Sequence, residues 1–453
     1  MNRQRDYKFI EATVSICPSC LKRVDAKIIQ IGEKIFLLKN CPEHGEQKEL
    51  LEEDAEYFLK RNDYTKPGTI SKIQTSSKKG CPFDCGLCEK HDQHTCIGLI
   101  EVTHKCDLCC PICYANSGKG NHLDLKIIEK MMDFYQDSEF NEAEILQISG
   151  GEPTTHPQIL KIIEMAKEKK FKYVMLNTNG LRISQDEEFV KKLGEFRGGF
   201  EIYLQFDGFK EETYKHLRGR DLREIKKRAI ANLEKYSIPI TLVSTIEEGI
   251  NDDEIGKIIE FGLNSETIRG INFQPLCFSG RVKGVKRDKR ITLTGVLKRI
   301  EEQTKGIILK KDFIPLPCDV DRIAVNYMYR DNGEFTSLAR HMDIKKHLLF
   351  IDNTFNFDAD SIIKKFKENM FCCGCSCLNF LKDLKKIIPK EFVSKSKEEK
   401  MQYINENTFR ISISSFLDPY NFDVKSSQKE CVHIITPDLR KIPFSAYSML
   451  HRK

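Results

Sequence analysis

The sequence predicts an α/β protein built on a parallel β-sheet and preceded by small cysteine-rich units. From residue 97 to residue 275, short apolar segments alternate with amphipathic segments of helical spacing. Alternation of this length predicts a parallel sheet, either open or curled into a barrel. The chain also holds 18 cysteines among 453 residues, gathered in tight groups. In a long chain within a reducing compartment, such groups favour metal binding over disulfides.

Composition places the chain among ordinary globular proteins. Hydrophobic residues make up 40%, charged residues 31%, and the formal net charge is +6. This provides ample core material, and the charge is too mild to indicate nucleic-acid binding. No run reaches the ~20 apolar residues of a membrane-spanning helix, and the N-terminus is too polar for a signal peptide. We therefore expect a cytoplasmic protein.

Residues 1–62 are predicted to form a small metal-stapled unit. Cys17 and Cys20 lie in a Cys-Pro-Ser-Cys turn, and Cys41 and His44 lie in a Cys-Pro-Glu-His turn. These ligands suit tetrahedral zinc or a mononuclear iron, and the fourth ligand is either His44 or a cysteine from elsewhere. The segments 26–31 and 34–38 between the turns are predicted to form a β-hairpin.

Residues 63–96 form a second cysteine-rich segment. Cys81, Cys85, Cys88 and Cys96 could complete a cluster with no open position. An auxiliary 4Fe–4S cluster is the favoured interpretation, and zinc is the alternative.

Residues 97–289 carry the strand–helix alternation. The predicted strands are 97–103, 145–149, 173–177, 202–206, 240–245 and 271–274. In parallel α/β folds the site lies at the carboxyl ends of the strands. From the strand ends we expect cofactor contacts by Gly150, Gly151, Glu152, Pro153, Asn177, Asn179, Gln205, Asp207 and Gln274.

Three cysteines after the first strand carry the strongest indication of chemistry. Cys106, Cys110 and Cys113 have a CxxxCxxC spacing, which can hold three irons of a 4Fe–4S cube and leave the fourth open to a ligand. A purely electron-carrying cluster usually has four cysteines, so this loop argues against an iron–sulfur electron carrier. A zinc loop beside an unrelated turn is the alternative. Cys109 is interpreted as a packing residue.

Together with the Gly-Gly-Glu-Pro turn at 150–153, this loop resembles the radical SAM superfamily. The resemblance implies a partial (β/α)6 barrel whose catalytic cluster is held by Cys106, Cys110 and Cys113. It also implies that the turn binds the amino group of S-adenosylmethionine, with Glu152 complementing its charge. Reductive cleavage of S-adenosylmethionine then yields a 5′-deoxyadenosyl radical.

Residues 290–453 form a less periodic C-terminal region with further cysteines. A third cluster could draw its ligands from Cys318, Cys372, Cys375, Cys377 and Cys431, with Cys373 in the same group. The alternative is that the closely spaced cysteines at 372–377 are spare thiols.

Motifs along the whole chain resemble the archaeal tetraether lipid synthase family. They are the paired N-terminal turns, the insert before the radical loop, and the segments 177–180, 217–220, 272–275 and 418–423. The resemblance implies that the enzyme joins terminal carbons of two isoprenoid chains in a diether lipid. It also implies a long tunnel lined by Leu, Ile, Phe and Met. One departure is Ser445, which stands where that family has a cysteine, so one cluster ligand is missing or replaced.

Partners follow from the same resemblance. We expect a lipid substrate and an electron donor such as ferredoxin or flavodoxin. The segment 378–388 has an apolar face with interleaved lysines, which favours either peripheral membrane contact or packing on the core. An alternative function is modification of a peptide or other metabolite by a radical SAM enzyme with auxiliary clusters.

Overall fold

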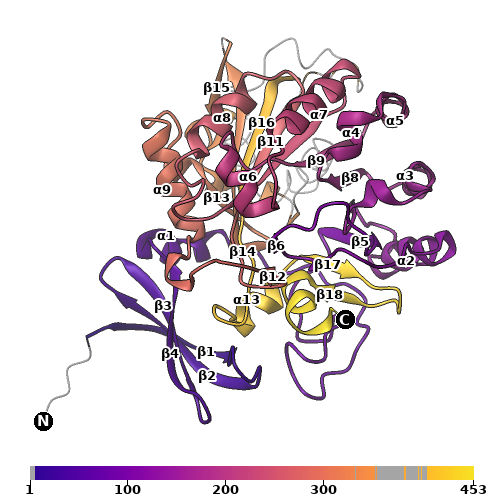
Figure 1. The fold of residues 1–453 in the computed structure, drawn as a ribbon. Coiled ribbons are helices and arrows are strands. Elements are labelled where there is room, and N and C mark those ends of the chain that lie inside the picture. The colour runs from indigo at the N-terminus through magenta and orange to yellow at the C-terminus, as the bar shows by residue number, and fades with distance from the viewer. Residues whose placement is uncertain are drawn as a thin grey trace, which may run out of the picture.

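The computed structural model describes residues 6–331, 333–351, 353–354 and 406–452, with positions 382, 383, 396, 399 and 403. A small antiparallel sheet at the N-terminus lies beside a large mixed sheet (Figure 1). Cys372, Cys373, Cys375 and Cys377 lie outside the described residues, as does most of the segment 378–388.

The N-terminal unit is a four-stranded antiparallel meander. Its strands are β1 (Lys8–Ile16), β2 (Arg23–Ile31), β3 (Lys34–Cys41) and β4 (Gly45–Glu52), followed by α1 (Ala55–Lys60). The predicted hairpin of β2 and β3 is confirmed. The two outer strands escape sequence reasoning because much of each is polar and exposed. Ile28, Ile35, Leu37 and Phe58 form the small core of the unit.

Six parallel strands in chain order form the centre of the large sheet, and each pairs with the next. They are β5 (Ile97–Thr103), β7 (Ile145–Gly150), β8 (Tyr173–Thr178), β9 (Phe200–Gln205), β10 (Ile240–Ile246) and β11 (Ile268–Pro275). Every residue of β5 is buried, as expected for a strand covered on both faces. The six predicted strands and the partial (β/α)6 architecture are confirmed.

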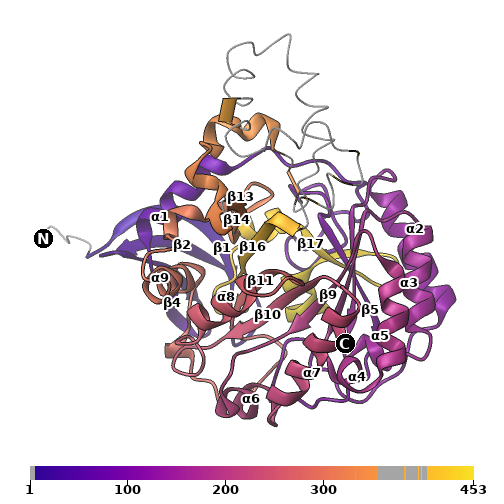
Figure 2. The ribbon, with the colours of Figure 1, turned by 90° about the horizontal axis from the view of Figure 1, so that it is seen from above.

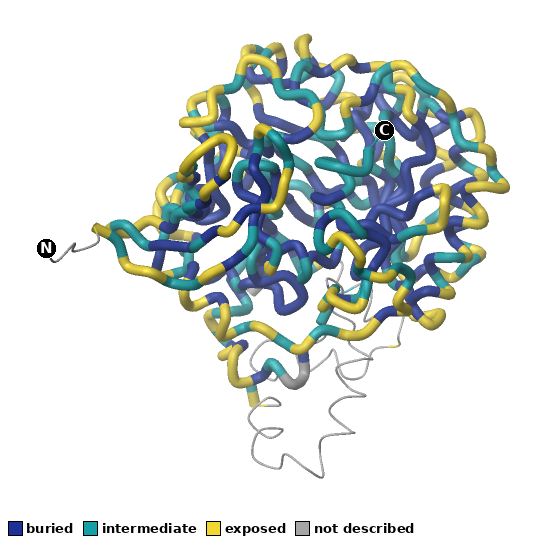
Figure 3. The backbone as a smooth tube through the Cα atoms, turned by 90° about the horizontal axis from the view of Figure 1, so that it is seen from below, coloured by how far each residue is buried: buried dark blue, intermediate teal, exposed yellow. Residues whose placement is uncertain are grey.

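Helices line the outer face of these strands, as Figure 2 shows for α2, α3 and α5. They are α2 (Leu125–Ser138), α3 (Ile159–Glu168), α4 (Leu181–Gln185), α5 (Glu187–Leu193), α6 (Glu211–Arg218), α7 (Arg223–Lys235), α8 (Ile255–Leu263) and α9 (Leu293–Gln303). In α2, Ile128, Met131, Met132 and Tyr135 are buried, because residues at this spacing share one helix face. The strands at the centre are buried and the periphery is exposed (Figure 3).

The C-terminal region extends the same sheet at both edges. β16 (Thr408–Ser414) lies parallel to β11, and β17 (Val432–Ile435) lies parallel to β5. The other elements are β6 (Ile112–Cys113), β12 (Arg281–Val282), β13 (Ile314–Leu316), β14 (Asp319–Asp331), β15 (Glu334–Ser337), β18 (Lys441–Pro443), α13 (Val424–Lys429) and α14 (Phe444–Ala446). Among the described residues, no helix has the length and apolar composition to cross a membrane.

Candidate functional site

The loop after β5 brings three of its four cysteines to one cavity. Cys106, Cys110 and Cys113 line a cavity of about 340 Å³ inside the sheet. Cys109 is exposed and does not line it. The prediction that Cys109 packs inside the protein is therefore wrong, because the loop turns its side chain toward solvent.

Contacts with a distant segment hold this cysteine loop. β6 pairs with β12, and Nε of Arg281 donates a hydrogen bond to the carbonyl oxygen of Cys110 at 2.7 Å. The backbone N–H of Leu108 points to Sγ of Cys106 at 3.4 Å. Burial raises the pKa of Cys106 to about 12 and also raises the pKa of Cys110, although the nearby Arg218 opposes the latter shift. Thiolates at these positions therefore need an added positive charge.

The two glycines at the end of β7, Gly150 and Gly151, allow the backbone to pass close beside the cysteine loop. Gly150 has a φ of +133°, and a Cβ there would meet the carbonyl oxygen of Thr103 at 2.2 Å. The backbone N–H of Gly151 donates to that same oxygen at 2.8 Å. A side chain at Gly150 would therefore be strained and would also push the two loops apart.

Glu152 is buried, and its carboxylate is occupied by donors from two turns. Oε1 accepts hydrogen bonds from N and Oγ1 of Thr154 at 3.0 and 2.7 Å and from Oγ1 of Thr178 at 2.8 Å. Oε2 accepts from the backbone N–H of Asn179 at 2.7 Å. These contacts make Glu152 a brace between the turns after β7 and β8. Its contact with an ammonium group stays a prediction.

The other predicted cofactor residues separate into two groups. Those that line the cavity are Gly150, Gly151, Glu152, Asn177, Asn179, Gln205 and Gln274. Pro153 is buried but does not line the cavity. Asp207 also lies behind the wall, where it is fully buried and pairs with Arg218 at 2.6 Å.

Lys226 is a functional candidate that sequence reasoning missed. Its side chain is completely buried, and Nζ donates to the carbonyl oxygen of Asn179 at 2.6 Å and to Oε1 of Gln205 at 3.2 Å. Burial lowers its pKa to about 7, even though Asp207 favours the charged form. The sequence feature that could have identified Lys226 is its position on the same face of α7 as the buried Ala229 and Leu233.

Polar and aliphatic side chains together form the wall of the cavity. Polar groups come from Gln147, Asn177, Tyr203, Gln205, Asn272, Gln274, Arg410 and Ser412. Aliphatic groups come from Leu99, Ile145, Met175, Val243, Ile323 and Val325. This wall differs from the uniformly apolar tunnel that the lipid resemblance predicts.

The predicted ligands of the N-terminal unit meet at one point. The ligand atoms of Cys17, Cys20, Cys41 and His44 all lie within 4.8 Å of one another. Nδ1 of His44 lies 3.5 Å from Sγ of Cys41 and 3.6 Å from Sγ of Cys17. Burial opposes ionisation of Cys17, but the backbone donors of Cys20 and Ser19 outweigh it and lower its pKa to about 6. A thiolate is thus prepared for a metal ion.

Comparisons with known proteins fit both parts of this arrangement. The model described as the Radical SAM superfamily matches residues 100–262, and the HMPTM N-terminal zinc ribbon domain matches residues 9–53. The 7,8-dihydro-6-hydroxymethylpterin dimethyltransferase of Methanocaldococcus jannaschii is 36% identical over 97% of this chain and 94% of its own length. The chain belongs to the radical SAM superfamily.

More distant matches cover part of the chain. A GTP 3′,8-cyclase of Clostridium botulinum (strain Langeland) is 24% identical over 57% of this chain and 77% of its own length. Among solved structures, Streptococcus suis SuiB bound to S-adenosylmethionine is 18% identical, covers 47% of each chain and has a TM-score of 0.39. The family model and the pterin dimethyltransferase support the radical SAM assignment made from the sequence, and they do not support the narrower resemblance to tetraether lipid synthases.

The radical SAM assignment implies a 4Fe–4S cluster and S-adenosylmethionine, and the described residues fit both. Cys106, Cys110 and Cys113 face one cavity, and burial of Cys106 and Cys110 raises the pKa of both and makes their unbound thiolates costly. These three residues would hold the cluster. Gly150 and Gly151 border the same cavity, and their backbone would bind S-adenosylmethionine.

The remaining cysteines are grouped differently from the prediction. The sequence predicts Cys96 as the fourth ligand beside Cys81, Cys85 and Cys88, but the structure gathers Cys96, Cys318 and Cys431 within 4.8 Å. The reason is the parallel pairing of β5 with β17, which begins where the backbone N–H of Cys96 donates to the carbonyl oxygen of Cys431 at 2.9 Å. Cys81 and Cys85 are near each other, since each shifts the pKa of the other.

Ser445 is buried and lines the cavity. Its backbone N–H and Oγ donate to Oε1 of Glu430 at 2.8 and 3.1 Å, and its Oγ accepts from the backbone N–H of Leu417 at 3.0 Å. Ser445 is thus satisfied by hydrogen bonds within the chain.

Proposed function

We propose that this protein is a radical SAM enzyme that methylates a small nitrogen heterocycle of the pterin class. The observation that carries the proposal is the 36% identity with a pterin dimethyltransferase over 97% of the chain. This belongs to the alternative weighed from the sequence, modification of a metabolite, rather than to lipid coupling.

The cavity wall supports a compact polar substrate. Six amide side chains line it, from Gln147 in β7, Asn177 in β8, Asn179 just after β8, Gln205 in β9, and Asn272 and Gln274 in β11. An amide both donates and accepts hydrogen bonds, which suits the ring nitrogens and carbonyl of a pterin. Aliphatic side chains between them suit its flat faces.

The chain's own residues bind the substrate, orient it and shield the reacting atoms from water. The bound cluster would supply the electron that cleaves S-adenosylmethionine to a carbon radical able to break a C–H bond. Glu152 and Lys226 brace the turns that border the cavity, and the aliphatic groups exclude water from the reacting atoms. The transfer balances with two molecules of S-adenosylmethionine and two electrons. Reductive cleavage of the first takes one electron and gives methionine, and the substrate hydrogen leaves in 5′-deoxyadenosine. The second gives its methyl group to the substrate carbon and, with the other electron, leaves as a thioether. An electron donor is required as the partner that reduces the cluster.

The test is a direct assay of the anaerobically reconstituted full chain. S-adenosylmethionine carrying a labelled methyl group is supplied with a reductant and 7,8-dihydro-6-hydroxymethylpterin, and the products are followed by mass spectrometry. We expect a pterin that gains one or two labelled methyl groups, and no such product with Cys110→Ala. Formation of 5′-deoxyadenosine that never depends on any pterin would refute the proposal.

Joining of two isoprenoid lipid chains is a second candidate, favoured by the motifs at 177–180, 217–220, 272–275 and 418–423. The aliphatic part of the wall is compatible with it. The amides disfavour it where their groups face the cavity without a partner, since a buried polar group left unpaired by a hydrocarbon chain costs about 1–3 kcal/mol. Some are already paired within the wall, such as Nδ2 of Asn177 with Oγ of Ser149 at 3.1 Å. A parallel assay with a detergent-solubilised diether lipid distinguishes the candidates, because coupling yields a product with about twice the mass and no added methyl group.

A further inference from the structure

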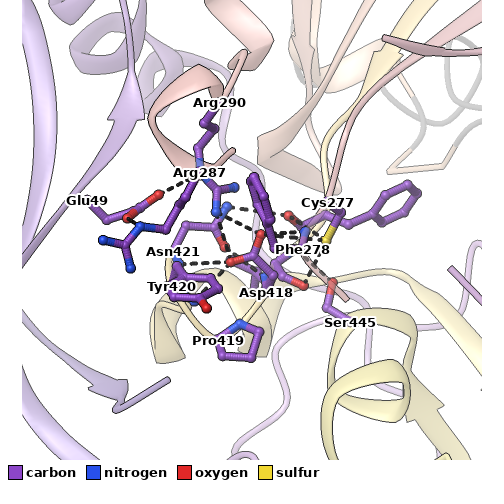
Figure 4. Close-up of polar contacts among 12 residues, drawn as sticks. Glu49, Cys277, Phe278, Arg287, Arg290, Asp418, Pro419, Tyr420, Asn421 and Ser445 are labelled. Carbon is purple, nitrogen blue, oxygen red and sulfur yellow. Dashed lines mark hydrogen bonds and ion pairs between the residues drawn. The ribbon is translucent and has the colours of Figure 1, made fainter. Parts of the chain in front are cut away.

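Three buried charged side chains join the N-terminal unit to the radical domain (Figure 4). Nε of Arg290 donates to Oε1 of Glu49 in β4 at 2.7 Å. Nη2 of Arg290 donates to both carboxylate oxygens of Asp418 at 3.0 and 2.9 Å. Each of the three residues is less than a tenth exposed. We call Glu49, Arg290 and Asp418 the Arg290 clamp.

Asp418 also forms hydrogen bonds with the backbone of two loops. Its Oδ2 accepts a hydrogen bond from the backbone N–H of Phe278, just after β11, at 3.0 Å. Its Oδ1 accepts from the backbone N–H groups of Tyr420 and Asn421 at 2.9 and 3.2 Å. The guanidinium of Arg290 also lies 4.8 Å from the centre of the Phe278 ring. One carboxylate thus sets the relative position of the loops after β11 and β16.

A buried lysine connects the metal ligands to the same loop. Lys39 in β3 is 2% exposed, and Nζ donates to the carbonyl oxygens of Ile16, Pro419 and Tyr420 at 2.9, 2.8 and 2.8 Å. Ile16 directly precedes Cys17. The backbone at the metal site and the loop that follows Asp418 therefore share one ammonium group.

The loops held by the clamp form part of the cavity wall. Cys277 and Phe416 line the cavity, each within two residues of a clamp contact. The ring of Phe416 lies 5.5 Å from that of Tyr114 and 4.8 Å from that of Phe444. Tyr114 directly follows Cys113 and stacks on Phe444 at 4.7 Å. This aromatic group lies between the clamp loops and the cysteine loop.

The charged groups of the Arg290 clamp fix how the N-terminal unit and the radical domain are oriented relative to each other. Nη2 of Arg290 meets both oxygens of Asp418 while Nε is held by Glu49, so two carboxylates fix the position and the plane of one guanidinium. Loss of Arg290 leaves the buried carboxylates of Glu49 and Asp418 without their shared partner, so the loops would have to move to rehydrate them. Loss of the Glu49 charge leaves Arg290 paired with Asp418 but weakens the contact that comes from the N-terminal unit. Apolar packing would join the two parts without restricting their orientation in this way.

We propose that the Arg290 clamp makes the N-terminal metal unit a positioning element of the radical site, which holds the Cys277 and Phe416 wall against the cysteine loop. Arg290 and Glu49 are positioning residues in this proposal. The wall keeps the substrate in place while the radical forms. The proposal goes beyond the proposed function and does not depend on which substrate the cavity takes.

The test compares Glu49→Gln, Arg290→Met and Arg290→Lys with Glu11→Gln in the reconstituted full chain. Glu11 is a matched control, because it also joins the N-terminal unit to the C-terminal region, through Lys425 at 2.6 Å, but its side chain is 32% exposed and that of Lys425 52%. Hydrogen exchange is followed in segments 275–280 and 415–423. The ratio of 5′-deoxyadenosine to modified product is measured in parallel.

In Glu49→Gln and Arg290→Met we expect severalfold faster exchange in both segments and severalfold more 5′-deoxyadenosine per product, with KM for the substrate raised. Arg290→Lys should recover part of the loss, and Glu11→Gln should match the parent protein. Faster exchange confined to residues 8–52, with an unchanged ratio, would overturn the proposal.

If Arg290→Met fails to fold, Glu49→Gln and Cys20→Ser decide the question. Cys20→Ser disturbs the metal site and leaves the clamp residues in place, and we expect the segment 415–423 to exchange faster. Unchanged exchange there in both variants would overturn the proposal. The exchange measurement needs no substrate, so it stays decisive even if no methylated pterin forms.

Discussion

Nδ2 of Asn179 donates a hydrogen bond to Oδ1 of Asp107 at 2.7 Å, which joins the turn after β8 to the cysteine loop after β5. Asp107 lies between Cys106 and Cys110 in the chain. The backbone N–H of Asn179 is held in turn by Glu152. The loops after β5, β7 and β8 thus form one hydrogen-bonded layer beside the cavity. A substitution in one of them should therefore alter the positions of the other two.

Replacement of Glu152 by Gln tests this layer. The amide of Gln has one acceptor oxygen where the carboxylate of Glu152 has two. Its NH2 group would therefore face one or more of the N–H and O–H groups that now donate to Glu152. We expect a loss of about 1–3 kcal/mol in the free energy of unfolding, because buried donors lose their acceptor, and weaker binding of S-adenosylmethionine by calorimetry. Glu188→Gln at an exposed site is the control. Unchanged stability with lost binding would instead favour direct contact between Glu152 and the ligand's ammonium group.

Replacement of single cysteines tests the ligand assignment in the radical loop. Cys110→Ala should abolish formation of 5′-deoxyadenosine, since Cys110 lines the cavity, whereas Cys109→Ala should retain most of it, since Cys109 is exposed. Chromatography of the quenched reaction measures both. Retained activity in Cys110→Ala together with its loss in Cys109→Ala would reverse the assignment.

The buried ammonium of Lys226 predicts a pH-dependent contribution to stability. Its pKa in the folded protein is lowered to about 7 from 10.5 by burial. Between these values the unfolded chain binds a proton that the folded chain lacks, so the stability of the parent protein relative to Lys226→Met should rise with pH. The slope should not exceed ~1.4 kcal/mol per pH unit. Below pH 7 both states are protonated and the difference should be flat.

Denaturant unfolding of both proteins across this pH range provides the measurement for Lys226. A difference that stays constant from pH 7 to pH 10 would show that Lys226 keeps an ordinary pKa.

Metal analysis of cysteine variants tests how the remaining thiols are grouped. At least about eight inorganic sulfides per chain are expected after reconstitution, four for each of two 4Fe–4S clusters. Cys96→Ser and Cys318→Ser should remove the same metal, so the double variant should lose no more iron than either single one. Cys81→Ser combined with Cys96→Ser should lose more than either alone. The reverse pattern would restore the grouping of Cys96 with Cys81, Cys85 and Cys88.

Local patterns in the sequence were sufficient to predict the central sheet and the metal ligands that lie close together in the chain. The six strands could be predicted because each is a short, nearly continuous apolar run that ends in Gly, Pro or polar residues. Cys106, Cys110 and Cys113 could be predicted because ligands on one loop depend only on their spacing. The same holds for Cys17 and Cys20, and for Cys41 and His44, whose hairpin brings two turns together.

Tertiary structure decided whatever depends on which distant segments become neighbours. Cys96 meets Cys431 because β17 adds to β5, and no spacing along the chain encodes that pairing. The Arg290 clamp joins strand β4 to a loop near the C-terminus, and Glu49 meets Arg290 only after the N-terminal unit has docked. Periodicity within one segment records which face is buried. It does not record which other segment covers that face, because packing is determined by the closure of the whole sheet.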